Sequence, residues 1–235
     1  MSSDVAGRMD RIYRPQRWIY DLTRKPYLIG RDRLLREIAP APGESIVEIG
    51  CGTGRNLVKL ARLHPAARLV GVEPSGVMRE AAVAAFRRHH VDARLIAGTA
   101  ERLTTATLGL PGGADHVVFS YVLSMIGDPA ATVSHALTLL RPGGRLHIVD
   151  FADMADLPPL AAAALRTWLG WFEVTPRPDA AGRLELLAAS GHGRLERRRL
   201  LGGYAELLRF QLGWSSSGYA GNALIPISLS ASWPT

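Results

Sequence analysis

The chain has 235 residues, 47% of them hydrophobic, and this size and composition favour one α/β domain with a single core. No stretch reaches the roughly 18 to 20 consecutive apolar residues of a membrane span, and the N-terminus lacks the apolar segment of a signal peptide, so a cytoplasmic protein without a transmembrane segment is expected. Cys51 is the single cysteine, which excludes an internal disulfide, and no metal is expected because cysteines and histidines do not cluster.

Positive charge is concentrated near the N-terminus. The formal net charge is +7 and the sequence pI is about 10.2. Residues 8–36 contain nine Arg and Lys residues against three Asp residues, which predicts contact with an anionic surface, either phospholipid headgroups or nucleic acid. Only two of the basic residues in the whole chain are lysines, so a GC-rich genome is an alternative reason for the many arginines.

The spacing of residues 15–38 predicts two helices separated by a kink at Pro26, because proline fits the first turn of a helix. At about 100° per residue, aromatic and guanidinium side chains fall on one face of this segment. They are Tyr13, Arg17, Tyr20, Arg24, Tyr27 and Arg31. A core stripe would not carry arginines, so this face is expected to meet solvent, a ligand or a partner. Residues 1–40 are therefore expected to form a helical cap.

Strand-like and helix-like segments alternate after this cap. Short β-branched runs at 45–50, 67–73, 93–98, 115–121 and 144–151 predict buried strands. Helices are predicted at 54–63, 76–89 and 131–140, the last one ended by "RPGG", and then at 158–172 and 181–190. Two further strand-like runs, 193–202 and 204–213, are expected to form a closing hairpin. The alternation predicts a mostly parallel sheet in a core of residues 41–213, followed by an irregular tail, 214–235.

A glycine-rich turn follows the first predicted strand. The sequence "VEIGCGTGRN" places Glu48 directly before Gly50, Gly52 and Gly54, and Glu73 closes the second strand. Glycines here allow a ligand to approach the backbone, and a carboxylate such as Glu73 can accept two ribose hydroxyls. The missing third glycine of a dinucleotide fingerprint and the acid before the turn argue against NAD, and a packing turn without ligand is the alternative. No neighbouring group in the sequence activates Cys51 as a nucleophile.

These motifs together resemble the class I S-adenosylmethionine-dependent methyltransferases. The acidic glycine motif matches residues 48–54, the second-strand acid matches Glu73, and the family's "PGG" matches 142–144. The resemblance implies a Rossmann-like seven-stranded sheet and S-adenosyl-L-methionine as cofactor. It implies further donor contacts by Pro74, Thr99, Ala100, Glu101 and Ser120, with Tyr121, Ser124 and Met125 beside the methyl group. Thr99 stands where the family usually has Asp, which leaves the adenine contact open between Thr99 and Glu101.

The stretch "RIYRPQRWIYDLTRKPYLIGRDRLL" resembles the start of the methyltransferases of betaine-lipid synthesis, in Tyr13, Gln16, 20–25 and 30–32. This resemblance implies three methylations of the amino group of diacylglyceryl-homoserine at the inner face of an anionic membrane. An aromatic cage tolerates an amine that becomes a quaternary cation, because cation–π attraction needs no hydrogen-bond direction. The expected cage consists of Tyr13, Tyr20 and Tyr121, and the expected acceptor-binding residues are Arg14, Gln16 and Arg24.

Other functions fit the same residues. Methylation of ethanolamine phospholipids or of a small metabolite is the alternative within the class, and an RNA-binding methyltransferase-like module is the alternative outside it. Nucleic acid is not the expected partner, because no separate RNA-binding domain is recognisable; the oligomeric state stays open. His135 and His147 are reserve candidates for the proton acceptor. The apolar side of residues 158–172 fits either packing on the sheet or contact with lipid.

Overall fold

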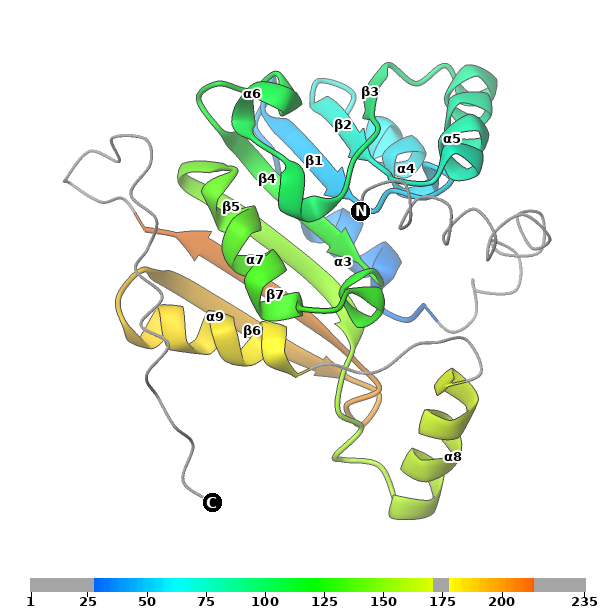
Figure 1. Ribbon diagram of the computed structural model, residues 1–235, viewed down its shortest axis with the longest axis vertical. Coiled ribbons are helices and arrows are strands. Elements are labelled where there is room, and N and C mark those ends of the chain that lie inside the picture. Colours follow the sequence, from blue (N-terminus) through cyan, green and yellow to red (C-terminus); the bar gives the residue numbers. More distant parts are fainter. Residues whose placement is uncertain (1–27, 171–177, 214–235) are drawn as a thin grey trace.

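The computed structural model describes residues 28–170 and 178–213. A seven-stranded sheet in the order β3-β2-β1-β4-β5-β7-β6 forms its centre (Figure 1). The strands are β1 (Ser45–Ile49), β2 (Arg68–Val72), β3 (Ala93–Ile96), β4 (Ala114–Ser120), β5 (Leu140–Phe151), β6 (Gly193–Leu200) and β7 (Ala205–Leu212). β1 to β5 are parallel, whereas β7 runs antiparallel to both β5 and β6. The predicted parallel sheet with a closing hairpin is confirmed.

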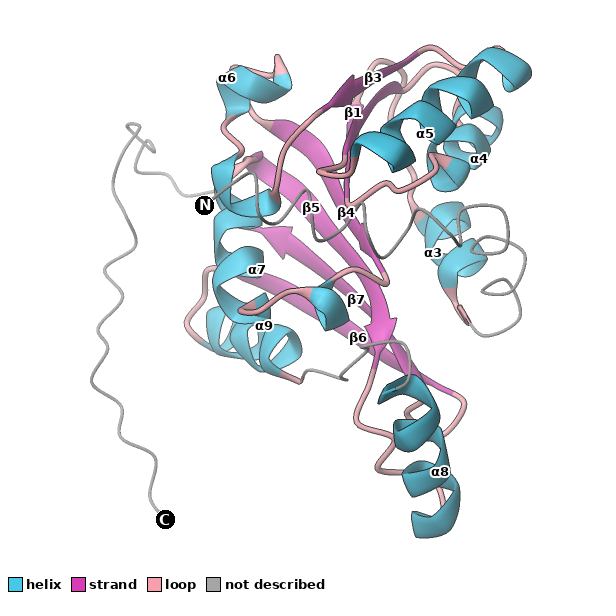
Figure 2. Cartoon of the chain, turned by 45° about the vertical axis from the view of Figure 1, so that its right-hand side comes forward, coloured by secondary structure: helices cyan, strands magenta, loops and turns pink. Residues whose placement is uncertain are grey.

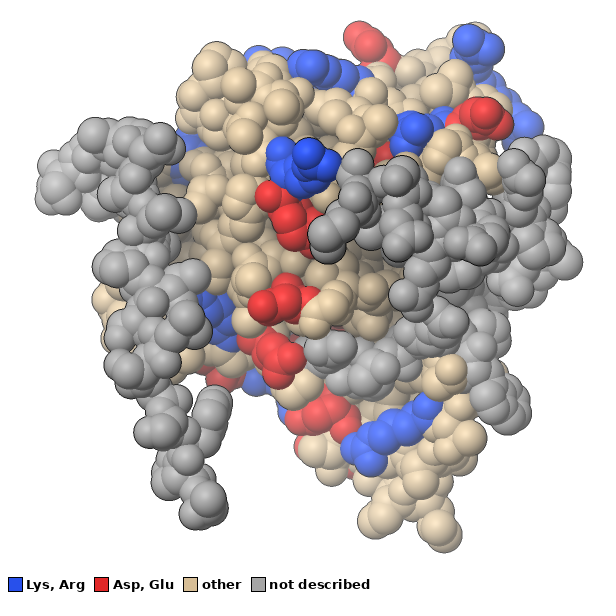
Figure 3. Space-filling view, in the orientation of Figure 1, with Lys and Arg blue, Asp and Glu red and all other residues tan. Residues whose placement is uncertain are grey.

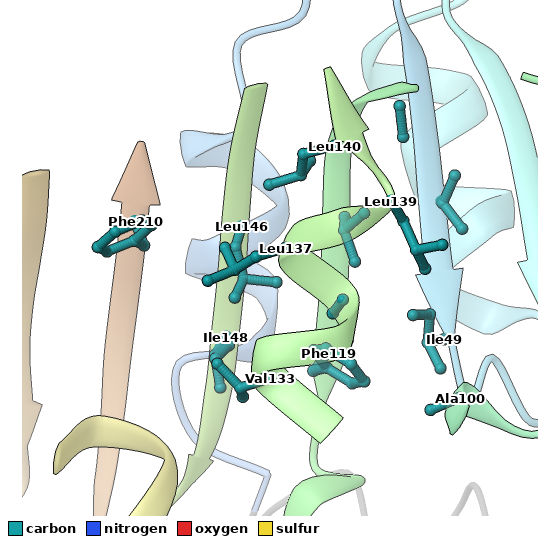
Figure 4. Packing of buried hydrophobic residues seen from close by; sticks show 14 of the residues in the cluster. Ile49, Ala100, Phe119, Val133, Leu137, Leu139, Leu140, Leu146, Ile148 and Phe210 are labelled. Atoms are coloured by element: carbon teal, nitrogen blue, oxygen red, sulfur yellow. The ribbon is translucent and has the colours of Figure 1, made fainter. Parts of the chain in front are cut away.

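Helices cover both faces of the sheet because alternate strand residues point to opposite sides. One face packs against α3 (Arg31–Glu37), α4 (Arg55–Leu63) and α5 (Gly76–His89), and the other against α6 (Thr105–Leu108), α7 (Pro129–Thr138) and α9 (Asp179–Ala189). Neighbouring residues show the alternation, since Val118 faces the α4 side and Phe119 the α7 side. Figure 4 shows Phe119, Ile148 and Val133 packed between the sheet and α7.

The "RPGG" segment differs from its prediction. It follows α7, but residues 141–144 belong to β5, which begins at Leu140 rather than at Gly144. The pairing of β5 with β4 shifts in register between Ala114 and His116, which accommodates the turn-like glycines. A Cβ on Gly144 would lie 3.0 Å from the Ala114 carbonyl oxygen, so glycine permits this close strand contact.

The predicted helix after Pro26 begins later than expected. Residues 29–30 form a turn, Gly30 has φ of +84°, and α3 begins at Arg31. The turn breaks the helical phase, so Arg31 does not continue the predicted aromatic and guanidinium face; it is buried on the side of Leu34 and Leu35. Of the three surroundings expected for this face, solvent, a ligand or a partner, burial excludes solvent for Arg31. The rest of the predicted cap and the tail lie outside the described residues.

Three short elements were not predicted. They are the 3-10 turns η1 (Ala100–Arg102) and η2 (Leu123–Met125) and the one-turn helix α6. Segments of three or four residues show no hydrophobic periodicity, so the sequence pattern could not indicate them. By contrast, α8 (Pro159–Gly170) matches its prediction and projects away from the sheet in both Figures 1 and 2. None of the helices described is long and apolar enough to span a bilayer.

Candidate active site

The glycine turn lies at the edge of the sheet where the parallel strands end, which we call the carboxyl edge. Gly50, Gly52 and Gly54 all have positive φ, of 73°, 54° and 75°. The turn is tied to β2, because the amide nitrogens of Gly50 and Cys51 both donate to the Val72 carbonyl, at 2.8 and 3.0 Å. The turn therefore needs glycine conformations and is held rigidly against the neighbouring strand.

The three glycines have different surroundings. A Cβ on Gly50 would collide with the Val122 side chain, and one on Gly54 would lie 2.6 Å from the Phe86 ring. A Cβ on Gly52 would meet no atom within 4 Å. Gly50 and Gly54 are thus required by packing, whereas the backbone of Gly52 borders open space at the carboxyl edge.

Glu73 joins the end of β2 to the glycine turn. Its side chain is buried, and its two carboxylate oxygens accept hydrogen bonds from the amide nitrogens of Gly52 and Ser75, each at 3.0 Å. The Glu73 amide donates to the Ile96 carbonyl at 3.0 Å, which aligns the ends of β2 and β3. The carboxylate is fixed at the position where the sequence predicts ribose binding.

Glu48 is a buried carboxyl directly before the turn. Asn56 Nδ2 donates to its Oε1 at 2.6 Å, whereas Oε2 is buried and has no hydrogen-bond partner among the described residues. Burial raises the pKa of Glu48 to about 8, opposed by the Asn56 hydrogen bond and the positive charge of Arg31. Burial, together with the negative charges of Glu48 and Glu73, also raises the pKa of the Cys51 thiol far above its ordinary value. An unpartnered carboxyl oxygen here suits a ligand that carries positive charge or donates hydrogen bonds.

The predicted adenine-side residues lie after β3. Thr99 precedes η1, Ala100 is buried, and Glu101 is exposed. Pro74 is half-buried, and its carbonyl accepts a hydrogen bond from Arg79 Nη1 at 2.6 Å. Pro74 and residues 99–101, all predicted donor contacts, thus follow β2, the neighbour of β1, and β3, the next strand of the sheet.

Ser120 and Tyr121 lie at the end of β4. Ser120 Oγ is a second buried oxygen that no side chain or amide of residues 28–170 and 178–213 bonds. Tyr121 is buried, has φ of +57°, donates its hydroxyl to the Ile29 carbonyl and packs edge-on against Phe151, with ring centroids 4.7 Å apart. Tyr121 therefore anchors the segment that precedes α3 to the carboxyl edge, a role that the sequence did not indicate.

Asp150, near the end of β5, was not predicted as a site residue. Its Oδ2 accepts hydrogen bonds from the amide nitrogens of Leu123 at 2.8 Å and Ser124 at 3.3 Å, and Oδ1 accepts from Phe151 at 2.8 Å. Burial raises its pKa to about 6, opposed by these hydrogen bonds. Asp150 thus fixes the loop after β4, which carries the residues expected beside the methyl group. Its position before the end of a predicted strand was the available signal.

We expect Asp150→Asn to slow methyl transfer about tenfold or more, roughly 1.4 kcal/mol, with unchanged donor affinity, because the loop after β4 loses an acceptor. In the wild type, activity should fall as pH drops through about 6, since protonation of Asp150 weakens the same bonds. The pH profile of kcat checks both points. Asp128→Asn is the matched control, because Asp128 caps α7 and Asn caps helices equally well. A wild-type rate in Asp150→Asn would contradict this role.

The other predicted residues do not gather at this edge within the described chain. Tyr13, Arg14, Gln16, Tyr20 and Arg24 lie outside the described residues, so their predicted roles stay predictions. The reserve bases have other partners. His147 Nε2 lies 3.0 Å from His116 Nδ1, and His116 Nε2 lies 3.2 Å from Glu44 Oε2, before the start of β1. His135 Nε2 lies 2.9 Å from the Leu103 carbonyl.

The sheet order, the glycine turn and the two carboxylates define a class I Rossmann-like methyltransferase fold. The geometry fits the donor: Glu73 offers two acceptor oxygens, Glu48 and Ser120 each bury an unpartnered oxygen, and Gly52 borders open space.

Comparison with known proteins supports this class. The methyltransferase domain family matches residues 20–202, and the chain belongs to this family. A demethylmenaquinone methyltransferase of Beutenbergia cavernae is 31% identical over 225 residues, which cover 92% of this chain and 85% of that protein. An O-methyltransferase of Pyrenophora dematioidea is 28% identical over 166 residues, or 69% of this chain and 59% of that protein.

Solved structures share the fold at low sequence identity. An O-methyltransferase family protein from Burkholderia thailandensis has a TM-score of 0.64 at 19% identity, covering 83% of this chain and 60% of that one. A geranyl diphosphate methyltransferase in complex with SAM has a TM-score of 0.58 at 16% identity, covering 80% of this chain and 85% of that one. The protein is an S-adenosylmethionine-dependent methyltransferase.

S-adenosylmethionine supplies an electrophilic methyl group on a sulfonium. Glu48, Glu73 and the glycine turn would hold the donor, and the acceptor would have to lie in line with the methyl group.

We expect Glu73→Ala to weaken donor binding by about 1.5 to 3 kcal/mol, because two acceptor oxygens are lost and the Gly52 amide loses its partner. Titration calorimetry with S-adenosylmethionine measures the change. Glu80→Ala, an exposed change in α5, the helix that follows Glu73, should bind the donor like the wild type. Equal affinities in the two variants would refute the assignment of Glu73.

Proposed function

We propose that the protein trimethylates the amino group of diacylglyceryl-homoserine to give the betaine lipid diacylglyceryl-trimethylhomoserine, at the inner face of the membrane. The observation that supports this is the place at which the betaine-lipid-like stretch, residues 11–35, joins the described core. Its last part, 28–35, is attached to the carboxyl edge beside Glu48 and Tyr121. The part of the sequence that resembles betaine-lipid enzymes is thus connected directly to the donor site.

Several contacts make this attachment firm. The Tyr121 hydroxyl donates to the Ile29 carbonyl. The positive charge of the buried Arg31 lowers the pKa of Glu48, against the effect of burial. Asp32 pairs with Lys59 of α4 at 2.9 Å and with Arg55 at 3.4 Å. The described part of this stretch, residues 28–35, is therefore fixed at the carboxyl edge.

The chemistry of the acceptor agrees with the residue types of that stretch. The amine must be neutral to attack, and its product is a quaternary cation that aromatic faces can hold at every stage. We assign Tyr13 and Tyr20 to this cage. Tyr121 would contribute its ring, because its hydroxyl is engaged by Ile29. Arg14, Gln16 and Arg24 are proposed to bind the homoserine carboxylate.

The second candidate is methylation of a demethylated menaquinone. It is favoured by the demethylmenaquinone methyltransferase of Beutenbergia cavernae, which matches 92% of this chain. Both acceptors are lipids. An enzyme acting on either one would work at a membrane, where its arginines would be attracted to anionic headgroups. They differ in the reacting atom, which is an amine nitrogen in one and a ring carbon in the other.

The experiment supplies the full-length protein with labelled S-adenosylmethionine and separate vesicles that contain diacylglyceryl-homoserine, phosphatidylethanolamine or demethylmenaquinone. We expect label in the homoserine lipid, progressing from one to three methyl groups. Label in the quinone would establish the second candidate, and label in phosphatidylethanolamine the phospholipid alternative. An absence of label from the homoserine lipid overturns the proposal, and retention on RNA that salt removes would favour the binding module.

A further inference from the structure

We propose that α8 and the turn between β6 and β7, residues 201–204, form an apolar surface that inserts shallowly into lipid beside the active site. This inference rests on the proposed lipid substrate, which an enzyme must reach at the bilayer. It concerns residues that are separate from the arginine-rich N-terminal stretch. We call this surface the α8 surface.

The α8 surface lies on the same side of the molecule as the donor site. β5 ends at Phe151 on the carboxyl edge, and Phe151 pairs with Ala205, where β7 begins. The turn is joined to the segment before α8, because the amide nitrogens of Ala152 and Met154 donate to the carbonyls of Tyr204 and Gly203, at 3.1 and 2.9 Å. Figures 1 and 2 show α8 extending from this edge.

Apolar side chains of the α8 surface are exposed to an unusual degree. Leu160 is 87% exposed and Leu201 is 65% exposed. Pro159, Ala161, Ala163 and Ala164 are also exposed. Ala162 and Leu169 are buried, so the helix packs on the body through one side and presents the other to its surroundings. A small apolar face of this kind matches shallow insertion at the acyl boundary.

The charges around α8 cancel. Arg166 is the one charged residue between 157 and 170, and its Nη2 donates to the Asp153 carbonyl at 2.7 Å. Arg199 pairs with Asp153 and, at 3.0 Å, with Asp156. In Figure 3 the surface over α8 is mostly uncharged, with one cationic patch beside an acidic one. A surface without net charge complements the uncharged glycerol and acyl region and gains little from anionic headgroups.

A second copy of the chain fits this surface less well than lipid does. A twelve-residue helix is about 18 Å long, and Leu160 is the one large hydrophobic side chain on α8 that is exposed. A stable dimer buries about 800 Å² on each partner, which is more than one such helix face supplies. Lipid requires no matching surface of fixed shape, so we assign lipid as the occupant.

The test measures co-sedimentation of the full-length protein with phosphatidylcholine vesicles at about 0.5 M salt, where interactions between exposed charges are screened. We expect wild-type protein to bind and Leu160→Glu to bind at least fivefold more weakly, with a further loss in Leu160→Glu/Leu201→Glu. Leu186→Glu is the matched control, because Leu186 is 64% exposed but belongs to α9 and not to the α8 surface. Leu160→Phe should bind at least as well as the wild type.

Three outcomes overturn the inference: no wild-type binding at high salt, equal loss in Leu160→Glu and Leu186→Glu, or a dimer in sedimentation equilibrium that Leu160→Glu dissociates. The vesicles contain no acceptor, so the result does not depend on which lipid is methylated. Activity on a short-chain, water-soluble homoserine analogue is measured in parallel. Vesicle binding through Leu160 without any methylation of that analogue would refute the proposed substrate and leave the α8 surface standing.

Discussion

Gly52→Ala is expected to lower donor affinity about a hundredfold, roughly 2.7 kcal/mol, while the protein stays folded. The new methyl group meets no protein atom within 4 Å, so it projects into the open space at the carboxyl edge. The positive φ of 54° adds strain of about 1 kcal/mol, which a folded domain tolerates. Titration calorimetry and thermal unfolding of the same preparation separate binding from stability.

Gly43→Ala is the matched control for this variant. Gly43 also has a positive φ, of 82°, and open surroundings, but it lies in the turn that precedes β1, at the opposite edge of the sheet. It should lose the same small amount of stability and keep full donor affinity. If Gly52→Ala binds the donor like Gly43→Ala, the glycine turn does not contact the donor.

Glu48→Gln is expected to change the pH dependence of both stability and donor binding. The pKa of Glu48 is raised to about 8 by burial from an ordinary value of 4.5. The folded state therefore holds the proton more tightly than the unfolded state, and stability falls as pH rises from about 4.5 to about 8. The linkage relation gives a loss of roughly 3 to 5 kcal/mol from this one group. Glutamine carries no such penalty.

Urea unfolding at pH 5 and pH 8 measures this effect, because all other titrating groups are shared by the two proteins. The variant should match the wild type at pH 5 and exceed it by a few kcal/mol at pH 8. Donor affinity of the wild type should rise with pH, because ionised Glu48 attracts a cationic ligand. The variant should bind the donor weakly at both pH values. Parallel pH profiles for the two proteins would contradict the buried carboxylate as a donor ligand.

The geometry of the glycine turn could be predicted because its residues are close in sequence and conformationally constrained. A glycine turn between a buried strand and a helix requires φ values that glycine supplies, and Gly50, Gly52 and Gly54 have them. Glu73 closes the neighbouring strand, and parallel strand order brings it to the same edge. Local pattern and topology together were sufficient here.

Other features depend on contacts between distant segments, which no local pattern reports. Tyr121 and Ile29 are 92 residues apart, and Asp150 and Leu123 are 27 residues apart. Arg31 was predicted to share one helical face with the aromatic and basic residues of 13–27, because the 3.6-residue spacing was extended across Gly30. The left-handed conformation of Gly30 interrupts the helix directly before Arg31. The burial of Arg31 near the buried carboxyl of Glu48 is favoured only once α3 has packed beside β1.

The raised pKa of the Cys51 thiol limits its reaction with the methyl donor. A sulfonium methyl group alkylates thiolates readily, and Cys51 lies between Gly50 and Gly52 of the donor-binding turn. Burial, together with the charge of Glu73 and that of Glu48 once it ionises, keeps that sulfur protonated and makes it a poor nucleophile. The carboxyl groups proposed to bind the donor would therefore also protect this sulfur from methylation by the donor and from oxidation.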